Sequence, residues 1–333
     1  MESTYLSHNI NKRLFLFSCC MPVKGSRRGA VYDLQRDDIE LVPNSLIDFI
    51  HYINKKPVQD ILDEWRDNEV AQEYLELLIE KEFVFLSSED HFPKLSNKCI
   101  NDDTSKIEFM TLTISDFIIE KIQMIAERIE YLGVKRLHLH FPFEVDLEKM
   151  SGLIQSFKQS CVINLSISIP YQKDFNPNII QEQRLKSIYF YNSPYSDTIE
   201  IYKINLYFLK CSEHDLLLPK ANIDAMAINH RAFLTGKNAN LGLYKTIFVN
   251  AVGRIQLNST DINEYGCILG SEIEKSLSLL SEIWNIRRDK ITPCRNCELK
   301  YACTANYIPE YDKGNSRYFV NCNYNPYSNE WAI

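Results

Sequence analysis

The sequence lacks several features that would place it in common functional classes. Its densest apolar stretch, Val162–Pro170, is the size of a strand and too short to span a membrane. It contains neither a GxxxxGK loop followed by Ser or Thr nor a GxGxxG after a strand, so nothing predicts an ATP site. Its basic residues are scattered and the formal net charge is −7, which argues against nucleic acid or an acidic membrane surface as a partner.

The N-terminus has no long apolar run, so we expect no secretory signal and a cytoplasmic protein with reduced thiols. The chain has 333 residues, of which 45% are apolar, and this is enough for two or three domains with ample cores. Six of the ten cysteines are dispersed, and we give the vicinal pair Cys19-Cys20 no role.

The other four cysteines gather in a short C-terminal stretch. They follow the pattern C-x2-C-x5-C-x18-C and are Cys294, Cys297, Cys303 and Cys322. A pair separated by two residues can chelate one metal centre, because a tight turn aims both sulfurs the same way. Two further thiolates complete a four-sulfur set, which suits zinc or an iron–sulfur cluster.

The pattern of residues 1–88 predicts a small winged-helix-like unit with three strands followed by three helices. The strands are expected at Arg13–Cys19, Gly29–Leu34 and Ile39–Val42, and the helices at Leu46–Asn54, Pro57–Trp65 and Glu69–Glu82. The polar segment Asp90–Asp103 reads as a linker.

Residues 104–235 alternate between strand and helix patterns, which predicts an α/β fold with a parallel sheet. The repeat is too short for eight units, so we expect a partial β/α barrel, with a last strand at Ala225–Asn229. Residues 236–333 form a third part, with a hairpin at Phe248–Gln256, a helix at Ser276–Ile286 and then the four cysteines.

Both ends of the chain resemble one family. Trp284–Cys303 with Cys322–Tyr327 resembles a SPASM domain, the auxiliary iron–sulfur domain of peptide-modifying radical SAM enzymes. Phe17–Gly25, with Asp33–Arg36, looks like the start of the SPASM-domain peptide maturases of grasp-with-spasm systems. That resemblance implies two partners in graspetide (RiPP) biosynthesis: a ribosomally made precursor peptide and an ATP-grasp ligase that crosslinks it. The first eighty or so residues also resemble a RiPP recognition element, which grips leader peptides.

The chain departs from the radical SAM pattern at a decisive point. Those enzymes need C-x3-C-x2-C to hold the cluster that binds S-adenosylmethionine, and the sequence has no such triplet. Between Ile107 and Asn250 the only cysteines are Cys161 and Cys211, fifty residues apart. We therefore expect no S-adenosylmethionine and no radical chemistry, and we leave open whether the protein is an enzyme.

A complete SPASM domain holds two clusters. The resemblance places ligands of the first near Gly242, at Asn258 and at Tyr307, where no cysteine stands, whereas the four ligands of the second are all present. It therefore implies one metal centre, most simply a [4Fe–4S] cluster. Zinc is the first alternative, although structural zinc sites usually use two C-x2-C knuckles and this chain has one. The second is that the four cysteines bind no metal.

Two histidines on a predicted strand, His138 and His140, point to the same face of the sheet. With Glu144 and Asp146 directly after the strand, they are the candidates for an acid–base site. The favoured interpretation is that both are polar residues at a strand end whose hydrogen bonds are satisfied.

Peptide binding has a physical basis in the first unit. A peptide can add a strand beside Ile39–Val42 and pack on the third helix, with Leu41, Tyr74 and Leu78 as candidate contacts. For Leu78, packing inside the unit is the favoured explanation. The resulting hypothesis is a maturation partner that binds a precursor peptide and assists an ATP-grasp ligase. The alternatives are a redox or other peptide-modifying enzyme that uses the single cluster, or a zinc-stabilised scaffold.

Overall fold

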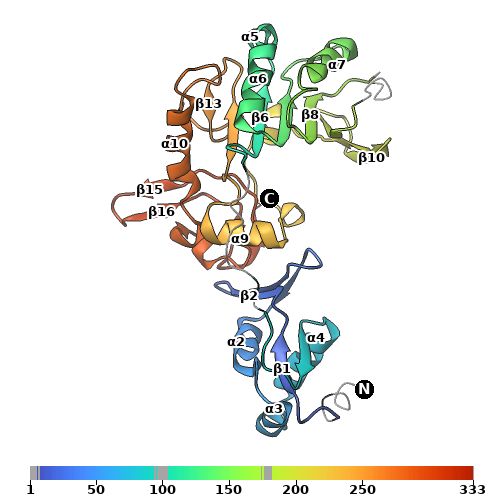
Figure 1. The fold of residues 1–333 in the computed structure, drawn as a ribbon, viewed down its shortest axis with the longest axis vertical. Coiled ribbons are helices and arrows are strands. Elements are labelled where there is room, and N and C mark those ends of the chain that lie inside the picture. Colours follow the sequence, from blue (N-terminus) through green and yellow to red (C-terminus); the bar gives the residue numbers. More distant parts are fainter. Residues whose placement is uncertain are drawn as a thin grey trace.

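The computed structural model describes residues 6, 8–93, 95, 104–173, 175 and 182–332. Three parts follow one another along the long axis of the molecule (Figure 1). An N-terminal unit lies at one end and a large sheet with its helices at the other. Between them lies the cysteine module, which we define as residues 285–332. In the described part of the chain, no helix is long and apolar enough to cross a membrane.

The N-terminal unit contains a three-stranded antiparallel sheet in the order β2-β3-β4. Its strands are β2 (Cys20–Lys24), β3 (Gly29–Asp33) and β4 (Asp38–Val42). Strand β1 (Arg13–Leu16) pairs instead with β5 (Val84–Ser87) in a separate two-stranded sheet. The expected strand at Arg13–Cys19 is therefore shorter and belongs elsewhere. Pro22 interrupts the strand pattern of β2 and is tolerated because β2 is an edge strand.

The helices of this unit lie where their periodicity places them. They are α2 (Asn44–Ile53), α3 (Val58–Trp65) and α4 (Glu69–Glu80). The apolar stripe of α2 is buried, including Leu46 and Ile50, because residues three and four apart share one face of a helix. Asn68 caps α4 by accepting a hydrogen bond from the backbone N–H of Ala71 at 3.0 Å.

The large sheet has eight strands and is mainly parallel, which confirms the α/β prediction. Its order is β10-β11-β9-β8-β7-β6-β12-β13, and only the outermost pairs, β10–β11 and β12–β13, are antiparallel. The strands are β6 (Phe109–Thr113), β7 (Arg136–His140), β8 (Asn164–Pro170), β9 (Leu185–Tyr191), β10 (Asp197–Ile201), β11 (Ile204–Phe208), β12 (Thr246–Val249) and β13 (Ile255–Gln256). The predicted hairpin at Phe248–Gln256 thus joins this sheet as β12 and β13.

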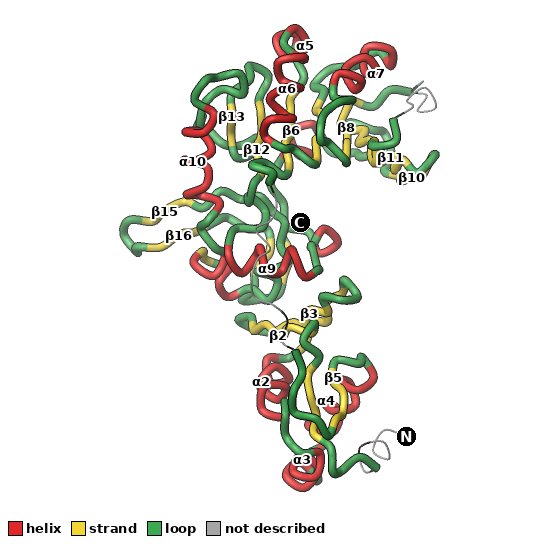
Figure 2. The backbone as a smooth tube through the Cα atoms, in the orientation of Figure 1, coloured by secondary structure: helices red, strands yellow, loops and turns green. Residues whose placement is uncertain are grey.

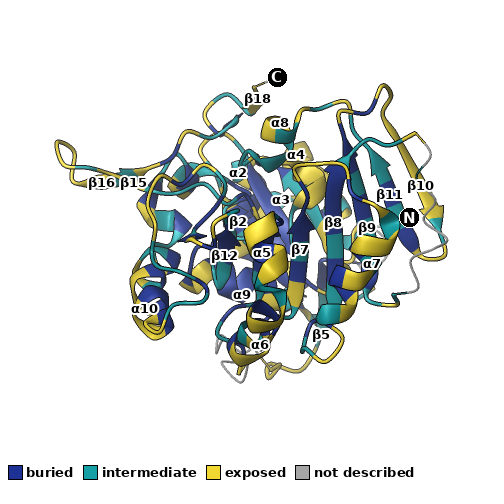
Figure 3. Ribbon diagram, turned by 90° about the horizontal axis from the view of Figure 1, so that it is seen from above, coloured by how far each residue is buried: buried dark blue, intermediate teal, exposed yellow. Residues whose placement is uncertain are grey.

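Four helices cover one face of this sheet: α5 (Asp116–Glu120), α6 (Ile122–Leu132), α7 (Leu147–Ser156) and α10 (Ile273–Trp284). Their apolar residues form one core with those strand residues that point toward them, such as Leu139 and Ile167. Figure 3 shows the central strands β7, β8 and β9 side by side, with buried positions alternating with partly exposed ones. The two faces of the sheet are therefore different in character.

Short elements connect the large sheet to the cysteine module and build the module itself (Figure 2). They include α8 (Glu213–Leu217), α9 (His230–Asn238), β14 (Ile291–Thr292), β15 (Glu310–Asp312), β16 (Arg317–Phe319), β17 (Tyr324–Asn325) and β18 (Glu330–Trp331). The strand expected at Ala225–Asn229 is wrong. A short 3-10 turn occupies Ile223–Ala225, and Asn229 caps α9 by accepting from the N–H of Ala232 at 2.9 Å.

Candidate functional site

The structure brings the four predicted cysteines together. Cys294, Cys297, Cys303 and Cys322 line one small cavity of about 20 Å³ inside the cysteine module. Cys294 begins a 3-10 turn (Cys294–Asn296) that carries the chain to Cys297, while Cys322 lies just before β17. Apolar residues complete the walls of the cavity, among them Met226 and Trp331. Cys294 and Cys303 are buried and Cys297 and Cys322 are partly exposed, so the site is a cluster of four thiols that is only partly shielded from water.

A buried arginine lies against this cluster. Arg288 is 2% exposed, and its Nη1 donates to the sulfur of Cys294 at 3.7 Å. Its Nη2 donates to the carbonyl of Ala305, whereas its Nε has no hydrogen-bond partner. In the described part of the chain, no carboxylate forms an ion pair with this guanidinium. A buried cation needs nearby negative charge, and the cysteine sulfurs are the groups placed to supply it.

The cysteines can supply that charge only when they are deprotonated. Burial raises the pKa of Cys294 and Cys297, and it raises the pKa of Cys322 to about 11. Without a bound metal these groups would thus remain neutral thiols at neutral pH. A coordinated metal deprotonates its thiol ligands, so a metal centre would give Arg288 its counter-charge. The donor set and the orphaned Nε both fit such a centre.

Backbone amides also point at the sulfurs. The N–H of Leu299 donates to the sulfur of Cys297, and the N–H of Tyr324 donates to that of Cys322, both at 3.4 Å. In each pair the amide lies two residues after the cysteine. Hydrogen bonds of this kind stabilise negative charge on sulfur, and they tune the reduction potential of iron–sulfur clusters.

The spacing of the sulfurs bears on which metal fits. Tetrahedral zinc, with Zn–S bonds of about 2.3 Å, holds its sulfurs only about 3.8 Å apart. Among the described residues, groups of three ligand atoms within 4.8 Å of one another include Cys19, Cys20 and Asp33 but none of the four module cysteines. No three of these four sulfurs therefore lie within 4.8 Å of one another. Zinc and iron–sulfur clusters are both metal centres that take four thiolate ligands.

A second buried charged group ties the cysteine module to the N-terminal unit. Glu298, fully buried, accepts from Arg28 Nε at 2.7 Å and from the hydroxyl of Tyr324 at 2.5 Å. Its backbone carbonyl accepts from the hydroxyl of Tyr32 at 2.5 Å. Gly25 approaches the same backbone so closely that an added Cβ would lie 2.9 Å from the nitrogen of Glu298. The β2–β3 hairpin is thus docked on the residue next to a cysteine ligand.

Sequence reasoning missed both of these buried charges. Arg288 is one of two adjacent arginines, and only the fold distinguishes it from Arg287, which pairs with Asp289 at the surface. No local signal marked Glu298 as buried, since Arg295, which follows Cys294 directly, is exposed. Nothing local indicated that the partner of Glu298 would be Arg28.

Gly242, Asn258 and Tyr307, the positions where a complete SPASM domain would have ligands of its first cluster, lie close together in the structure. An added Cβ on Gly242 would meet the backbone of Ala305, and the side-chain amide of Asn258 donates to the carbonyl of Asn306 at 2.8 Å. The hydroxyl of Tyr307 donates to Asn323 Oδ1 at 2.6 Å. Close backbone packing and hydrogen-bonded polar side chains therefore occupy this region.

The two histidines on β7 point to one face, but their partners differ from those expected. His140 Nε2 lies 3.0 Å from a carboxylate oxygen of Glu213 in α8. Glu144 is exposed and Asp146 caps α7 by accepting from the N–H of Glu148 at 2.9 Å. The acidic residues that follow β7 in sequence turn outward with the loop, whereas α8 brings Glu213 back over the sheet. Glu144 is therefore not the residue that pairs with these histidines.

The three candidate peptide contacts lie in different surroundings. Leu78 is fully buried in the core of the N-terminal unit. Leu41, on β4, packs toward Tyr32 and Ala302 on the side of the cysteine module. Tyr74 lines a groove of about 560 Å³ between α2, α3 and α4, and its hydroxyl lies 2.7 Å from that of Ser45. Of the three, Tyr74 faces a groove and Leu78 does not.

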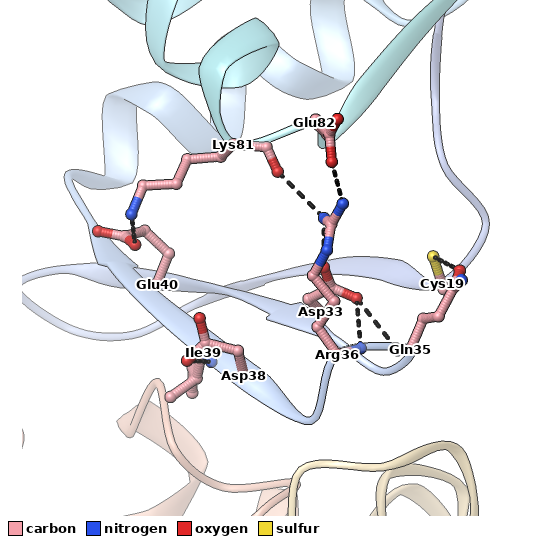
Figure 4. Close-up of polar contacts among 9 residues, drawn as sticks. All are labelled: Cys19, Asp33, Gln35, Arg36, Asp38, Ile39, Glu40, Lys81 and Glu82. Carbon is pink, nitrogen blue, oxygen red and sulfur yellow. Dashed lines mark hydrogen bonds and ion pairs between the residues drawn. The ribbon is translucent and has the colours of Figure 1, made fainter.

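An ion pair joins the end of α4 to β4, an edge strand. Lys81, at the end of α4, donates to Glu40 on β4 at 2.7 Å, whereas the Tyr74–Ser45 contact joins α4 to α2. Figure 4 shows the Lys81–Glu40 pair beside Arg36, which bonds to Asp33, to the carbonyl of Lys81 and to Glu82. Within the described residues, β4 pairs only with β3, so its outer edge is free.

The vicinal cysteines lie beside a cavity of about 450 Å³ in the N-terminal unit. Cys19, Cys20 and Asp33 bring their ligand atoms within 4.8 Å of one another. Asp33, however, already accepts from the backbone N–H groups of Gln35 and Arg36, and from the Arg36 side chain at 3.0 Å. Burial also raises the pKa of Cys20, which favours the neutral thiol. Their proximity follows from the pairing of β2 with β3, in which Cys20 lies opposite Asp33.

Comparison with known proteins leaves the family undecided. No family model matches the chain, and no curated protein matches it.

Proposed function

We propose that this protein is a maturation partner in the biosynthesis of a ribosomally made peptide. It binds a precursor peptide through its N-terminal unit and assists an ATP-grasp ligase, without radical SAM chemistry. One [4Fe–4S] cluster, held by Cys294, Cys297, Cys303 and Cys322, orders the C-terminal part. Zinc in the same four-cysteine site is the alternative.

The observation that carries the proposal is the contact between the two ends of the chain. A three-stranded sheet with three helices, as in a winged-helix peptide-binding unit, sits directly on the four-cysteine module through Arg28, Tyr32 and Glu298. These are the same two ends whose sequences resemble the grasp-with-spasm maturases. The free edge of β4 beside α4 offers unpaired N–H and C=O groups to an incoming strand.

The cluster is assigned a supporting role. When bound, it would supply one-electron transfer, and its four protein ligands leave no open position for a substrate. The chain's own residues place it next to the hairpin that carries the N-terminal unit, since Glu298 follows Cys297 directly. A metal centre at this position would fix the hairpin, and with it the peptide-binding edge.

The peptide part of the proposal is tested by titrating a fluorescently labelled precursor peptide with the protein, alone and with the ligase. We expect saturable binding, and we expect Tyr74→Ala to weaken it at least tenfold, because an aromatic side chain in a groove is a common binding hot spot. Tyr131→Ala, on α6 of the large sheet, is the matched control and should bind like the wild type. Absence of binding both with and without the ligase would refute the proposal.

The mass of the precursor peptide separates this role from an enzymatic one. After incubation with this protein alone, we expect the peptide mass to remain unchanged. A change that depends on the four cysteines would instead favour a redox enzyme that uses the single cluster.

A further inference from the structure

The second face of the large sheet is polar, which is unusual for a mainly parallel sheet. Such sheets are usually covered on both faces, and their strands then read as continuous apolar runs. Here the residues that point away from the helices include Thr111, His138, Ser166 and Tyr189, on four neighbouring strands. They form the floor of a pocket of about 370 Å³, part of whose wall comes from Asn306 in the cysteine module.

A chain of hydrogen bonds crosses this floor. Ser166 Oγ lies 2.7 Å from His138 Nδ1, and His138 Nε2 lies 2.9 Å from Ser168 Oγ. Ser168 Oγ lies 2.7 Å from His140 Nδ1, and His140 Nε2 lies 3.0 Å from Glu213. Five side chains from β7, β8 and α8 are thus joined end to end.

Glu213, at the end of this chain, determines which group donates and which accepts in every hydrogen bond. A carboxylate only accepts, so His140 donates to Glu213 from Nε2 and its Nδ1 must accept from Ser168. The hydroxyl of Ser168 then accepts from His138 Nε2, and His138 Nδ1 accepts from Ser166. Burial lowers the pKa of His138 to about 3, with His140 adding to the effect, and burial also lowers the pKa of His140. Both imidazoles are neutral at pH 7, as the chain requires.

This direction gives the pocket a defined recognition property. The hydroxyl proton of Ser166 is committed to His138, so Ser166 offers only acceptor lone pairs to a ligand. In the described chain, no residue that lines the pocket carries a formal charge. Apolar parts of the walls come from Phe109, Phe248 and Leu216–Leu218, and uncharged polar parts from residues such as Asn258 and Asn306. A charged ligand group would lose its hydration there without meeting a counter-charge.

We propose that this pocket is a binding site for a neutral hydrogen-bond donor, an alcohol or a primary amide, carried on an apolar or aromatic body. Ser166 accepts its hydrogen bond, and the chain to Glu213 holds Ser166 as an acceptor. The inference does not depend on the metal in the cysteine module or on precursor binding at β4. The pocket would give the large sheet a binding function on the face opposite α5, α6, α7 and α10.

The direction of the chain is tested first, by nitrogen NMR of protein labelled at histidine. We expect His138 and His140 both to be neutral with the proton on Nε2. Glu213→Gln should mix the two tautomers, because an amide can donate as well as accept. Glu144→Gln is the matched control, since it alters an exposed carboxylate near the same strand, and it should change neither tautomer. A proton on Nδ1 of either wild-type ring would overturn the inference.

The ligand class is tested with four small probes of similar shape: benzyl alcohol, benzamide, benzoate and benzylammonium. The two neutral probes should shift the His138 resonances in a saturable way, at least tenfold more tightly than the two charged ones. Ser166→Ala should remove this preference, with thermal unfolding and the wild-type His140 signal used to show that the sheet is intact. Equal binding of charged and neutral probes, or unchanged binding in Ser166→Ala, would contradict the proposal.

Discussion

Replacing Arg288 with methionine is expected to make the proposed metal centre 10- to 100-fold less well retained, the usual cost of removing a partner just outside the ligand shell. Arg288 is buried against Cys294, and in the described chain no carboxylate pairs with it. Methionine fills a similar space without the charge, so the negative charge of the metal-bound thiolates would remain uncompensated in a medium of low dielectric constant. The measurement is the rate at which an iron chelator bleaches the anaerobically purified protein.

The neighbouring arginine provides the control for that experiment. Arg287→Met removes an equal charge one residue away, but Arg287 is partly exposed and pairs with Asp289 at 2.8 Å. We expect its bleaching rate to match that of the wild type, and we expect Arg288→Lys to restore part of the retention. If Arg288→Met and Arg287→Met lose the metal equally fast, the charge-compensation argument is wrong.

The second large effect is expected at the hairpin contact. Arg28→Ala leaves the fully buried Glu298 carboxylate without its cation, and breaking a buried ion pair in this way costs about 3–5 kcal/mol. We expect the free energy of unfolding to fall by that order and the β2–β3 hairpin to detach from the cysteine module. Urea denaturation gives the free energy, and proteolysis near Gly25 reports the detachment.

Two variants make this test specific. Arg27→Ala removes an exposed arginine beside Arg28 and should have little effect on stability. Arg28→Ala combined with Glu298→Gln should be less damaging than Arg28→Ala alone, because the second change removes the stranded charge. Equal losses in Arg27→Ala and Arg28→Ala would show that the ion pair does not secure the hairpin.

The helices and strands could be predicted from the sequence where their apolar residues recur at a regular spacing. Helix α2 has its apolar residues at helical spacing, and strands such as β8 alternate or run apolar, so both follow from the sequence. Strand β2 did not, because Pro22 breaks the pattern of a strand that is tolerated only at an edge. The β12–β13 hairpin was predicted, but its pairing with β6 in the large sheet was not, because no local pattern encodes a contact so distant in sequence.

The candidate site also has some residues that could be predicted from the sequence and others that could not. The four cysteines could be found because a C-x2-C pair with two further cysteines is a recognisable pattern in sequence, and the structure places all four around one cavity. The partners of these and other site residues could not, because they are distant in sequence. Arg28 and Glu298 are 270 residues apart, and His140 and Glu213 are 73 apart. Contacts of that kind follow from the way the parts pack together, and a single sequence carries no periodic signal of them.

The central claim is that the four-cysteine module of a peptide-maturation partner holds a [4Fe–4S] cluster. Its most direct test is iron, sulfide and zinc analysis of the full chain purified without oxygen, with all four cysteines intact. We predict about four irons and four sulfides per chain, as a single [4Fe–4S] cluster requires. One zinc per chain without sulfide, or no metal at all, would contradict the account.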